Sequence, residues 1–239
     1  MDPYVARSYV VTGAAQGVGR AIAERLARDG AVVALDREPI TWEHPRLTAV
    51  LGDAGDEADA ERAADAAERA APLAGWVNNA AVFRDTSLHE ASAAEVLELV
   101  SLNLGLAVTG SAVAVRRFLA AGTGGAIVNV SSHQAQRPVA GALPYATAKA
   151  AIEGLTRALA VDYGPNGIRA NAVALGSIAN PRVGDLEGEL AALHPLGRIG
   201  TPEEVAAVVA HLLEPGFVTG AVVPVDGGRA VLGHDPEAR

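Results

Sequence analysis

The sequence contains no cysteine, and this absence excludes disulfide bonds, thiol catalysis and thiolate metal sites. Its six histidines show no spacing typical of metal ligands, so we predict no metal site and find no support for a metal-dependent hydrolase. Aromatic residues are also scarce, at 4% of the 239 residues, although half of all residues are hydrophobic. A core of this kind must be built from Ala, Val and Leu, which suits helices packed closely on a parallel sheet.

Basic residues are fewer than acidic ones: the chain has 19 Lys and Arg residues and 28 Asp and Glu residues, and its formal net charge is −9. A nucleic-acid partner would require a basic face, so we expect none. The longest apolar stretch near a helix, residues 104–115, is interrupted by Thr109 and Ser111 and falls short of the roughly 20 residues of a membrane span. Residues 1–8 lack the apolar region of a signal peptide. We therefore expect a soluble, cytoplasmic protein with no membrane partner.

Strand-like and helix-like segments alternate along the chain. Short apolar runs predict strands at residues 9–11, 31–35, 47–51, 75–77, 126–130, 168–174 and 222–225. Helical patterns cover a first segment that Gly30 is expected to end as its C′ residue, and then residues 57–71, 92–121, 146–163 and 202–213.

This alternation predicts an α/β protein with a doubly wound parallel sheet of about seven strands and helices on both faces. Residues 38–46 contain two prolines and leave no room for a packed helix, so this crossover is expected to be short. Pro224 restricts the last strand to an edge of the sheet. No repeat or linker divides the chain, and we expect residues 1–239 to form a single domain.

A glycine-rich loop follows the first strand. Gly13, Gly17 and Gly19 lie between that strand and a helix, where the backbone can approach a phosphate closely and the helix N-terminus offers free N–H groups. Asp36 ends the second strand, about where an acidic residue reaches the ribose of an adenosine. A role as a turn residue before Pro39 is the alternative for Asp36.

A second group of polar residues follows the strand predicted at 126–130. Ser131 and Ser132 end that strand, and Tyr145 and Lys149 lie four residues apart at the front of the helical segment 146–163. Positions four apart share one face of a helix, and a positive charge beside a phenol favours phenolate, which makes Tyr145 a candidate proton donor. Taken alone, such a pair more often has a surface or packing role.

Further motifs occur along the sequence, in a consistent order with these two groups. They are Asp53, Asn78-Asn79-Ala80, Asn103, Pro195 to Glu204 and Val225 to Gly228. Together with Thr12-Gly13-x-x-x-Gly17-x-Gly19, Ser132 and Tyr145-x-x-x-Lys149, they make the sequence resemble the short-chain dehydrogenase/reductase (SDR) family from about residue 8 to residue 229. The resemblance implies a Rossmann-type domain with a cofactor half at about 8–130, a catalytic and substrate half at about 131–229, and a short polar tail at 230–239.

The resemblance implies a catalytic role for four residues. Tyr145 would exchange a proton with the substrate oxygen while hydride moves to or from the nicotinamide. Lys149 would lower the pKa of Tyr145 and hydrogen-bond the nicotinamide ribose. Ser132 would hold the substrate carbonyl or alcohol, whereas Ser131 would support the strand end. Asn103 would bend its helix and hold a water that relays protons through Lys149, although a hydrogen bond to nearby backbone is the simpler interpretation of its residue type.

The resemblance also implies a nicotinamide cofactor. Asp53 would meet the adenine amino group, and Asn78 and Asn79 would brace the sheet around the cofactor. The expected cofactor contacts lie on the loops after the strands and on the catalytic helix, and they are Gly13, Gln16, Gly17, Val18, Gly19, Asp36, Arg37, Asp53, Ala54, Asn79, Ala80, Tyr145, Lys149, Ile178 and Asn180.

The choice between NAD and NADP depends on Asp36 and Arg37. Asp36 would accept hydrogen bonds from the adenosine ribose hydroxyls of NAD and would repel the 2′-phosphate of NADP. Arg37 acts in the opposite direction, because a base at this position can bind that phosphate, but it can also turn outward to solvent. We expect NAD, with NADP the less favoured cofactor.

The function implied is that of an NAD(P)-dependent oxidoreductase that interconverts a secondary alcohol and a ketone of a small-molecule substrate. A cofactor-binding relative without catalytic activity, with a regulatory or scaffold role, is the alternative. Family members usually pair through the two long helices, here 92–121 and 146–163, so we expect a homodimer or homotetramer.

The sequence departs from the family pattern around the substrate site. Ala81 replaces a glycine that often closes the Asn-Asn-Ala-Gly motif, Leu175 precedes Gly176 where the family usually has proline, and Asn180 stands where a threonine is common. Residues 177–194 are few for a substrate lid. We expect one short, mobile helix at residues 186–193, in place of the usual helical pair, and an open cleft.

The substrate itself is not identified by these motifs. His133 and Gln134 directly follow Ser132, and two interpretations are open for them. They either face the pocket, which would indicate a polyol, a sugar or another hydroxylated substrate, or they bind the backbone of their own loop.

Overall fold

Seven parallel strands form one sheet in the computed structural model, which describes residues 6–84, 86–181, 183–214 and 216–233. The order of the strands is β3-β2-β1-β4-β5-β6-β7. Their bounds are β1 (Ser8–Thr12), β2 (Ala31–Asp36), β3 (Leu47–Leu51), β4 (Leu73–Asn78), β5 (Gly125–Ser132), β6 (Ile168–Leu175) and β7 (Val222–Val225). The predicted doubly wound parallel sheet is confirmed, and Pro224 lies in an edge strand as expected.

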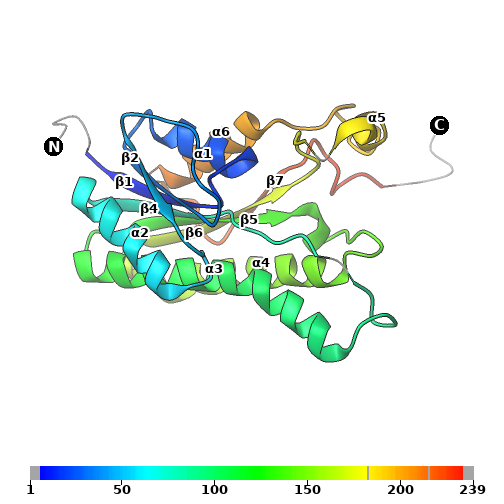
Figure 1. Cartoon of the computed structure of the whole chain (residues 1–239), viewed down its shortest axis with the longest axis horizontal. Coiled ribbons are helices and arrows are strands. Elements are labelled where there is room, and N and C mark those ends of the chain that lie inside the picture. The colour runs from blue at the N-terminus through cyan, green and yellow to red at the C-terminus, as the bar shows by residue number, and fades with distance from the viewer. Residues whose placement is uncertain (1–5, 85, 182, 215, 234–239) are drawn as a thin grey trace.

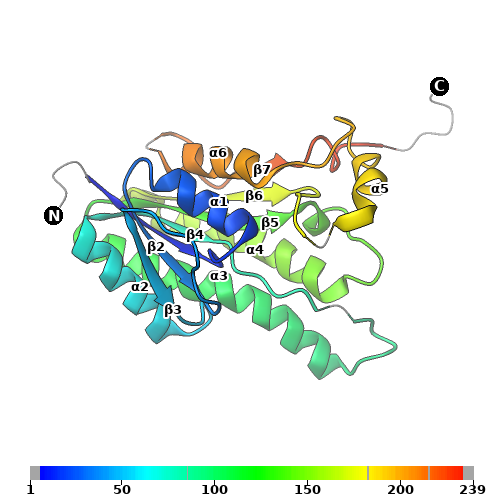
Figure 2. The same cartoon turned by 45° about the horizontal axis from the view of Figure 1, so that its top comes forward.

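Helices cover both faces of this sheet (Figures 1 and 2). On one face, α1 and α6 pack against each other, and on the other face α2, α3 and α4 lie side by side. Their bounds are α1 (Gly17–Leu26), α2 (Glu57–Ala70), α3 (Ala93–Ala121), α4 (Leu143–Tyr163) and α6 (Pro202–Leu213). Each face of the sheet therefore has a hydrophobic core of its own.

The two cores follow from the period of two along each strand. In β1, Val11 belongs to the core under α1 and α6, and its neighbour Val10 belongs to the core under α2, α3 and α4. In β4, Val77 and Trp76 divide in the same way. Because both faces of every central strand are buried, the strands are continuous apolar runs, which is the pattern that the sequence shows.

Side-chain caps explain where two of the helices begin. Ser92 accepts from the N–H of Glu95, and the Glu95 carboxylate accepts from the N–H of Ser92, so these residues form a capping box. Thr201 and Glu204 form the same motif at the start of α6. Ser92 is thus the N-cap of the helix predicted at 92–121, which begins one residue later.

Two predicted boundaries on the catalytic side differ from the structure. The helix predicted from residue 146 begins at Leu143, because Pro144 occupies its first turn, where a missing N–H costs no hydrogen bond. Tyr145 is therefore inside α4. The strand predicted at 126–130 extends through Ser132, since Ser131 and Ser132 both pair with β6.

The prediction for Gly30 is wrong. α1 ends at Leu26, and Gly30 lies in the turn that follows, where its N–H donates to the Leu26 carbonyl at 3.1 Å. A Cβ on Gly30 would lie 2.5 Å from the Arg7 carbonyl oxygen, so the glycine permits a close backbone approach and does not provide a left-handed cap.

Among the described helices, α3 is long and apolar enough by composition to cross a bilayer. In this fold it packs against α2, α4 and β4, and ten of its residues are buried. The core helix of a soluble protein passes the same test of length and composition, so α3 does not by itself indicate a membrane partner.

The strand order positions the functional site. All seven strands are parallel, so their carboxyl ends lie at one edge of the sheet, and the order reverses between β1 and β4. Ligands of open α/β sheets bind in the crevice outside the carboxyl ends at such a reversal. The loop after β1 contains the glycine motif, and the loop after β4 begins with Asn79.

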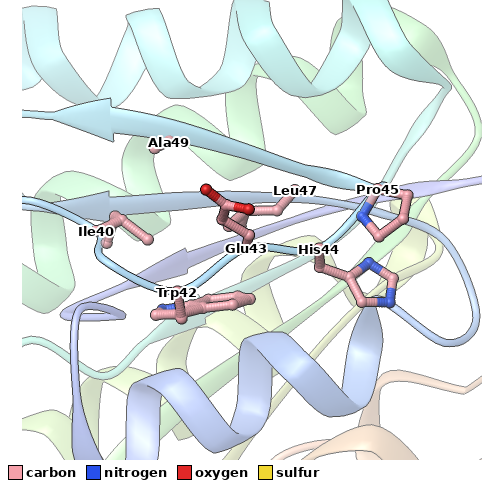
Figure 3. Close-up of a pocket in the computed structure, with 7 residues that line it drawn as sticks. All are labelled: Ile40, Trp42, Glu43, His44, Pro45, Leu47 and Ala49. Carbon is pink, nitrogen blue, oxygen red and sulfur yellow. The ribbon is translucent and has the colours of Figure 1, made fainter.

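Residues 37–46 connect β2 to β3 without a helix, as the two prolines predicted. Trp42 occupies part of the space that a helix would fill: its side chain is 6% exposed, and its Nε1 donates to the Ala14 carbonyl at 3.0 Å. The guanidinium of Arg20 lies 5.9 Å from its ring centroid. Beside Trp42, an open pocket is lined by Ile40, Glu43, His44, Pro45, Leu47 and Ala49 (Figure 3).

The segment between β6 and α6 contains one short helical stretch among the residues described. A 3-10 turn, Gly184–Leu186, leads directly into α5 (Glu187–Ala191), whereas the prediction was a helix at residues 186–193. His194 anchors its end, because Nδ1 bonds the Leu190 carbonyl at 2.7 Å and Nε2 accepts from the Ser177 N–H at 3.1 Å. The mobility of this stretch and the openness of the cleft stay predictions.

Replacement of Trp42 tests how far the short crossover depends on this side chain. Trp42→Ala should lower the free energy of unfolding by about 3–5 kcal/mol, because it leaves a large cavity against α1. Trp42→Phe should cost less, since it keeps most of the packing and loses the hydrogen bond to Ala14, worth about 1 kcal/mol. Urea denaturation measures both, with the exposed Thr41→Ala as control. An unchanged midpoint for Trp42→Ala would contradict this role.

Candidate functional site

The glycine loop after β1 is held against the loop after β4. Asn79 Nδ2 donates to the carbonyl oxygens of Thr12 at 3.0 Å and Gly13 at 2.9 Å. Thr12 Oγ1 accepts from the N–H groups of Asn79 at 3.0 Å and Ala80 at 3.1 Å. A Cβ on Gly19 would lie 2.0 Å from the Gly13 oxygen, so only glycine fits there. The linking role of Thr12 was not predicted, although the residue stands in the motif.

The first turn of α1 has the form of a phosphate site. Gly17 has a φ of +58°, and a Cβ there would meet nothing within 4 Å, so the backbone is open on this side. The first N–H groups of a helix have no partner within the helix, and together with the helix dipole they bind anions. The residues present therefore fit the pyrophosphate of a dinucleotide.

The other predicted cofactor residues lie at the same edge of the sheet. Gln16 is exposed at the N-cap of α1, Val18 is half-buried in its first turn, and Ala54 is buried after β3. Ile178 is buried after β6, and Asn180 Nδ2 donates to its carbonyl at 2.8 Å. Direct contact of these residues with a cofactor stays a prediction.

Asp36 at the end of β2 is fixed by backbone hydrogen bonds. Its carboxylate accepts from the N–H groups of Ala15 at 2.8 Å and Glu38 at 3.0 Å. Arg37 next to it forms an ion pair with Asp53, whose carboxylate also accepts from the Gly55 N–H at 2.8 Å. Burial raises the pKa of Asp53, but the hydrogen bonds from Arg37 and Gly55 outweigh burial and hold this pKa below its usual range.

The two serines at the end of β5 have different surroundings. Ser131 Oγ donates to the buried Glu153 at 3.0 Å. Ser132 Oγ accepts from the Gln134 N–H at 3.2 Å, and its own O–H donates to none of the described residues. Of the two serines, Ser132 is therefore the one whose hydroxyl hydrogen has no acceptor among the described residues, and its role in holding a substrate stays a prediction.

Tyr145 and Lys149 are both buried in the first turns of α4, at 8% and 3% exposure. Lys149 Nζ lies 5.4 Å from the Tyr145 ring centroid and donates to the Val130 carbonyl in β5 at 2.7 Å. Burial lowers the pKa of Lys149 to about 8. An ammonium has three donors, and two N–H groups of Lys149 have no hydrogen-bond partner among the described residues.

Asn103 is buried in α3, which is continuous α-helix through this position. Its Oδ1 accepts from the Val82 N–H at 2.9 Å and its Nδ2 donates to the Val82 carbonyl at 2.9 Å. Asn103 thus binds backbone, as the simpler interpretation expected, but its partner is the loop after β4 and not the nearby backbone of its own helix. The helix is not interrupted at Asn103, where the sequence analysis expected a local bend. The water relay stays a prediction.

Phe83 is a site residue that the sequence analysis missed. Its ring lies over Tyr145, with the two centroids 5.1 Å apart and the planes at 31°, and 61% of the side chain is exposed. It is held next to Val82, the residue that Asn103 binds. An isolated aromatic residue shortly after the Asn-Asn-Ala motif was the available signal, in a chain with three phenylalanines.

The structure bears on the two interpretations of His133 and Gln134, and that they face a substrate stays a prediction. His133 Nδ1 lies 3.1 Å from the Leu175 carbonyl, and the Gln134 N–H donates to Ser132, so both residues do bind backbone or their own loop. Yet His133 Nε2 and Gln134 Oε1 are buried without a hydrogen-bond partner among the described residues.

Comparison with known proteins agrees with this geometry. A family profile described as enoyl-(acyl carrier protein) reductase matches residues 13–230. The short-chain reductase protein NovJ of Streptomyces niveus is 39% identical over 92% of each chain. The cis-4-hydroxycyclohexanecarboxylate dehydrogenase of Sinomonas cyclohexanicum is 38% identical over 95% of this chain and 98% of its own.

A solved structure has a similar fold. The ligand-free aldohexose dehydrogenase AldT of Thermoplasma acidophilum superposes with a TM-score of 0.87 at 29% identity, over 99% of this chain and 98% of its own. The family profile and these relatives, which are named as reductases and dehydrogenases, confirm the predicted resemblance. The chain therefore belongs to the short-chain dehydrogenase/reductase family of oxidoreductases.

Proposed function

We propose that this protein transfers hydride between NAD and a secondary alcohol or ketone, with Tyr145 as the general acid/base. The observation that carries the proposal is the buried pair of Tyr145 and Lys149 in α4. The hydrogen bond from Lys149 to Val130 joins this helix to β5, the strand that ends in Ser132. This pair lies at the edge of the sheet where the glycine loop offers a phosphate site.

Each residue has a defined task in the proposed oxidation. Ser132 holds the substrate hydroxyl, and Tyr145 as phenolate takes the hydroxyl proton while the carbinol carbon gives up hydride and becomes a carbonyl carbon. NAD supplies the hydride acceptor when it is bound. Lys149 contributes a positive charge that favours the phenolate. In the reverse direction, the phenol of Tyr145 donates the proton to the alkoxide oxygen that forms.

The cofactor would be held by three parts of the chain. The glycine loop and first turn of α1 would bind the pyrophosphate, Asp36 would accept from the adenosine ribose hydroxyls, and the two remaining donors of Lys149 would face the nicotinamide ribose. Because Arg37 is paired with Asp53, its positive charge is partly neutralised, which supports NAD over NADP.

A non-catalytic relative with a regulatory or scaffold role is the alternative. Such a protein would need the cofactor site but not a buried phenol, ammonium and hydroxyl in one place. Keeping Lys149 buried is unfavourable, because burial disfavours its charged form. The presence of the complete set supports catalysis, and an assay with NAD and a panel of alcohols, followed by absorbance, separates the two functions.

The first prediction from this proposal concerns Tyr145. Tyr145→Phe should lower kcat by roughly two to four orders of magnitude, the usual contribution of acid–base catalysis, because it removes the exchangeable proton and keeps the ring under Phe83. The affinity for NAD, measured by calorimetry, should stay the same. Turnover of the variant near the wild-type rate would contradict the assignment.

The second concerns Lys149 and pH. Its pKa of about 8 in the folded protein lies below the ordinary 10.5, so the unfolded chain binds more protons between these values and stability rises with pH across that window. The gain is at most about 1 kcal/mol per pH unit. Lys149→Met should remove it, so wild-type minus variant unfolding free energy should increase from pH 7.5 to 9.5. A constant difference would show that the ammonium is not destabilised by burial.

The third concerns cofactor choice. Asp36→Asn removes the charge but keeps an oxygen to accept from the Ala15 N–H. A carboxylate about 4 Å from the 2′-phosphate is repelled by roughly 1 to 4 kcal/mol, so the variant should improve NADP affinity by roughly five-fold to several hundred-fold. Arg37→Ala is the matched control and should not favour NADP. Better catalytic efficiency of the wild type with NADP than with NAD would overturn the proposal.

A further inference from the structure

A second cavity opens beside the candidate active site, on the loop that joins Ser132 to Tyr145. Its volume is about 430 Å³. One wall comes from the start and middle of this loop, another from the end of the segment after α5, and a third from the C-terminal part of the chain. The lining residues are His133, Arg137, Pro138, Val139, Leu193, Arg229, Leu232 and Gly233.

Two arginines of this cavity have no carboxylate partner among the residues described. Arg229 donates to Ser177 Oγ at 2.6 Å, and Arg137 donates to the Leu232 carbonyl, so each guanidinium keeps further N–H donors. Burial lowers the pKa of Arg229, while Asp226 nearby acts against this. The carboxylate of Asp226 itself accepts hydrogen bonds from two backbone N–H groups, those of Gly228 at 2.9 Å and Ala230 at 2.7 Å.

His133 is a second, independent observation that points to a ligand. Its side chain is 6% exposed, its Nδ1 bonds the Leu175 carbonyl, and its Nε2 is buried without a partner among the residues described. A carbonyl accepts, so Nδ1 carries the hydrogen and Nε2 of the neutral ring presents a lone pair. Burial, followed by the charge of Arg229, lowers the pKa of His133 and favours this neutral form.

We propose that this cavity is a substrate subsite for a hydroxy acid with a second hydroxyl group, with the carboxylate between Arg137 and Arg229 and the hydroxyl that is not oxidised donating to Nε2 of His133. The planar fork of a guanidinium matches the two oxygens of a carboxylate. Pro138, Val139 and Leu193 offer apolar contact to a compact carbon skeleton. The inference names the substrate class of the function proposed above and rests on it for the identity of the reaction.

The cavity is lined in part by residues that lie between Ser132 and Tyr145 in the sequence, and this position suggests how the subsite orients a substrate. His133 directly follows Ser132, and Arg137 to Val139 lie in the loop that leads to Tyr145. A carboxylate held there would fix one end of the substrate while the alcohol to be oxidised reaches Ser132 and Tyr145. Fixing both ends restricts the reacting carbon to one orientation, which is the usual task of a remote charged contact.

Binding of inert probes tests the carboxylate contact without turnover. Cyclohexanecarboxylate and its neutral analogue cyclohexanecarboxamide have no alcohol to oxidise, and calorimetry with the purified protein, with and without NADH, measures their affinities. The acid should bind at least tenfold more tightly than the amide. Arg137→Gln and Arg229→Gln should each weaken the acid at least tenfold and leave the amide unchanged, whereas Arg229→Lys should retain part of the affinity.

Arg28 is an exposed arginine in the turn after α1, and Arg28→Gln is the matched control that should change neither affinity. Arg137 is exposed and its variant should fold, so the test does not depend on the variants of Arg229. Equal affinity for acid and amide, no measurable binding of the acid, or an acid affinity insensitive to both arginines would overturn the subsite. Tyr145→Phe should keep the probe affinity, so failure of the subsite and failure of the dehydrogenase proposal are separate results.

The hydroxyl contact has a test of its own. Quinate is a cyclohexanecarboxylate with added hydroxyl groups, and it should bind more tightly than the unsubstituted acid. His133→Phe should abolish that advantage and leave the affinity for cyclohexanecarboxylate within about twofold. If quinate has no advantage in the wild type, or keeps it in the variant, the contact to His133 is wrong.

Discussion

A buried chain of hydrogen bonds that begins at Asn78 joins the sheet to the two long helices, and the geometry of the site depends on it. Asn78 Nδ2 donates to Ser111 in α3 at 3.0 Å and to Asn129 in β5 at 2.8 Å, and Asn129 donates to Thr156 in α4 at 2.9 Å. A buried polar group left without a partner costs about 1–3 kcal/mol, so neither helix can slide along the sheet freely. Gly110 permits this approach, since a Cβ there would lie 2.1 Å from Asn78 Oδ1. The predicted bracing of the sheet by Asn78 is thus confirmed, and its relation to a cofactor stays a prediction.

The same anchored helices carry the polar residues of the site. α3 places Asn103 against Val82, which fixes the loop after β4, and α4 places Lys149 against the Val130 carbonyl in β5. Burial of an ammonium is energetically unfavourable, and no carboxylate of the described residues forms an ion pair with Lys149. A leucine at this position would pack at lower cost. The energetic penalty is therefore evidence for a function of the charge, because packing alone does not explain it.

How much the sequence could predict depends on whether a feature is local. The helix at 202–213 and the strand at 222–225 lie where their patterns place them, and the pair of Tyr145 and Lys149 is visible because one helical turn separates them. The start of α4 was misplaced, since the helix was predicted to begin after Pro144, which lies in its first turn. Phe83 was missed for a different reason: its contact with Tyr145 spans 62 positions along the chain, and no spacing rule connects a loop after one strand with a helix after another.

The candidate subsite illustrates that limit, and it also separates two kinds of residue in this site. Arg137, Leu193 and Arg229 come from three segments, and only the fold brings them around one cavity. The residues proposed as catalytic, in contrast, lie on β5 and α4, which the buried hydrogen bonds hold in place. Loops on a rigid scaffold tolerate substitution far better than the scaffold does. Under the proposed function, changes at Phe83 or at either arginine would therefore alter which alcohol is accepted while the positions of Ser132, Tyr145 and Lys149 stay the same.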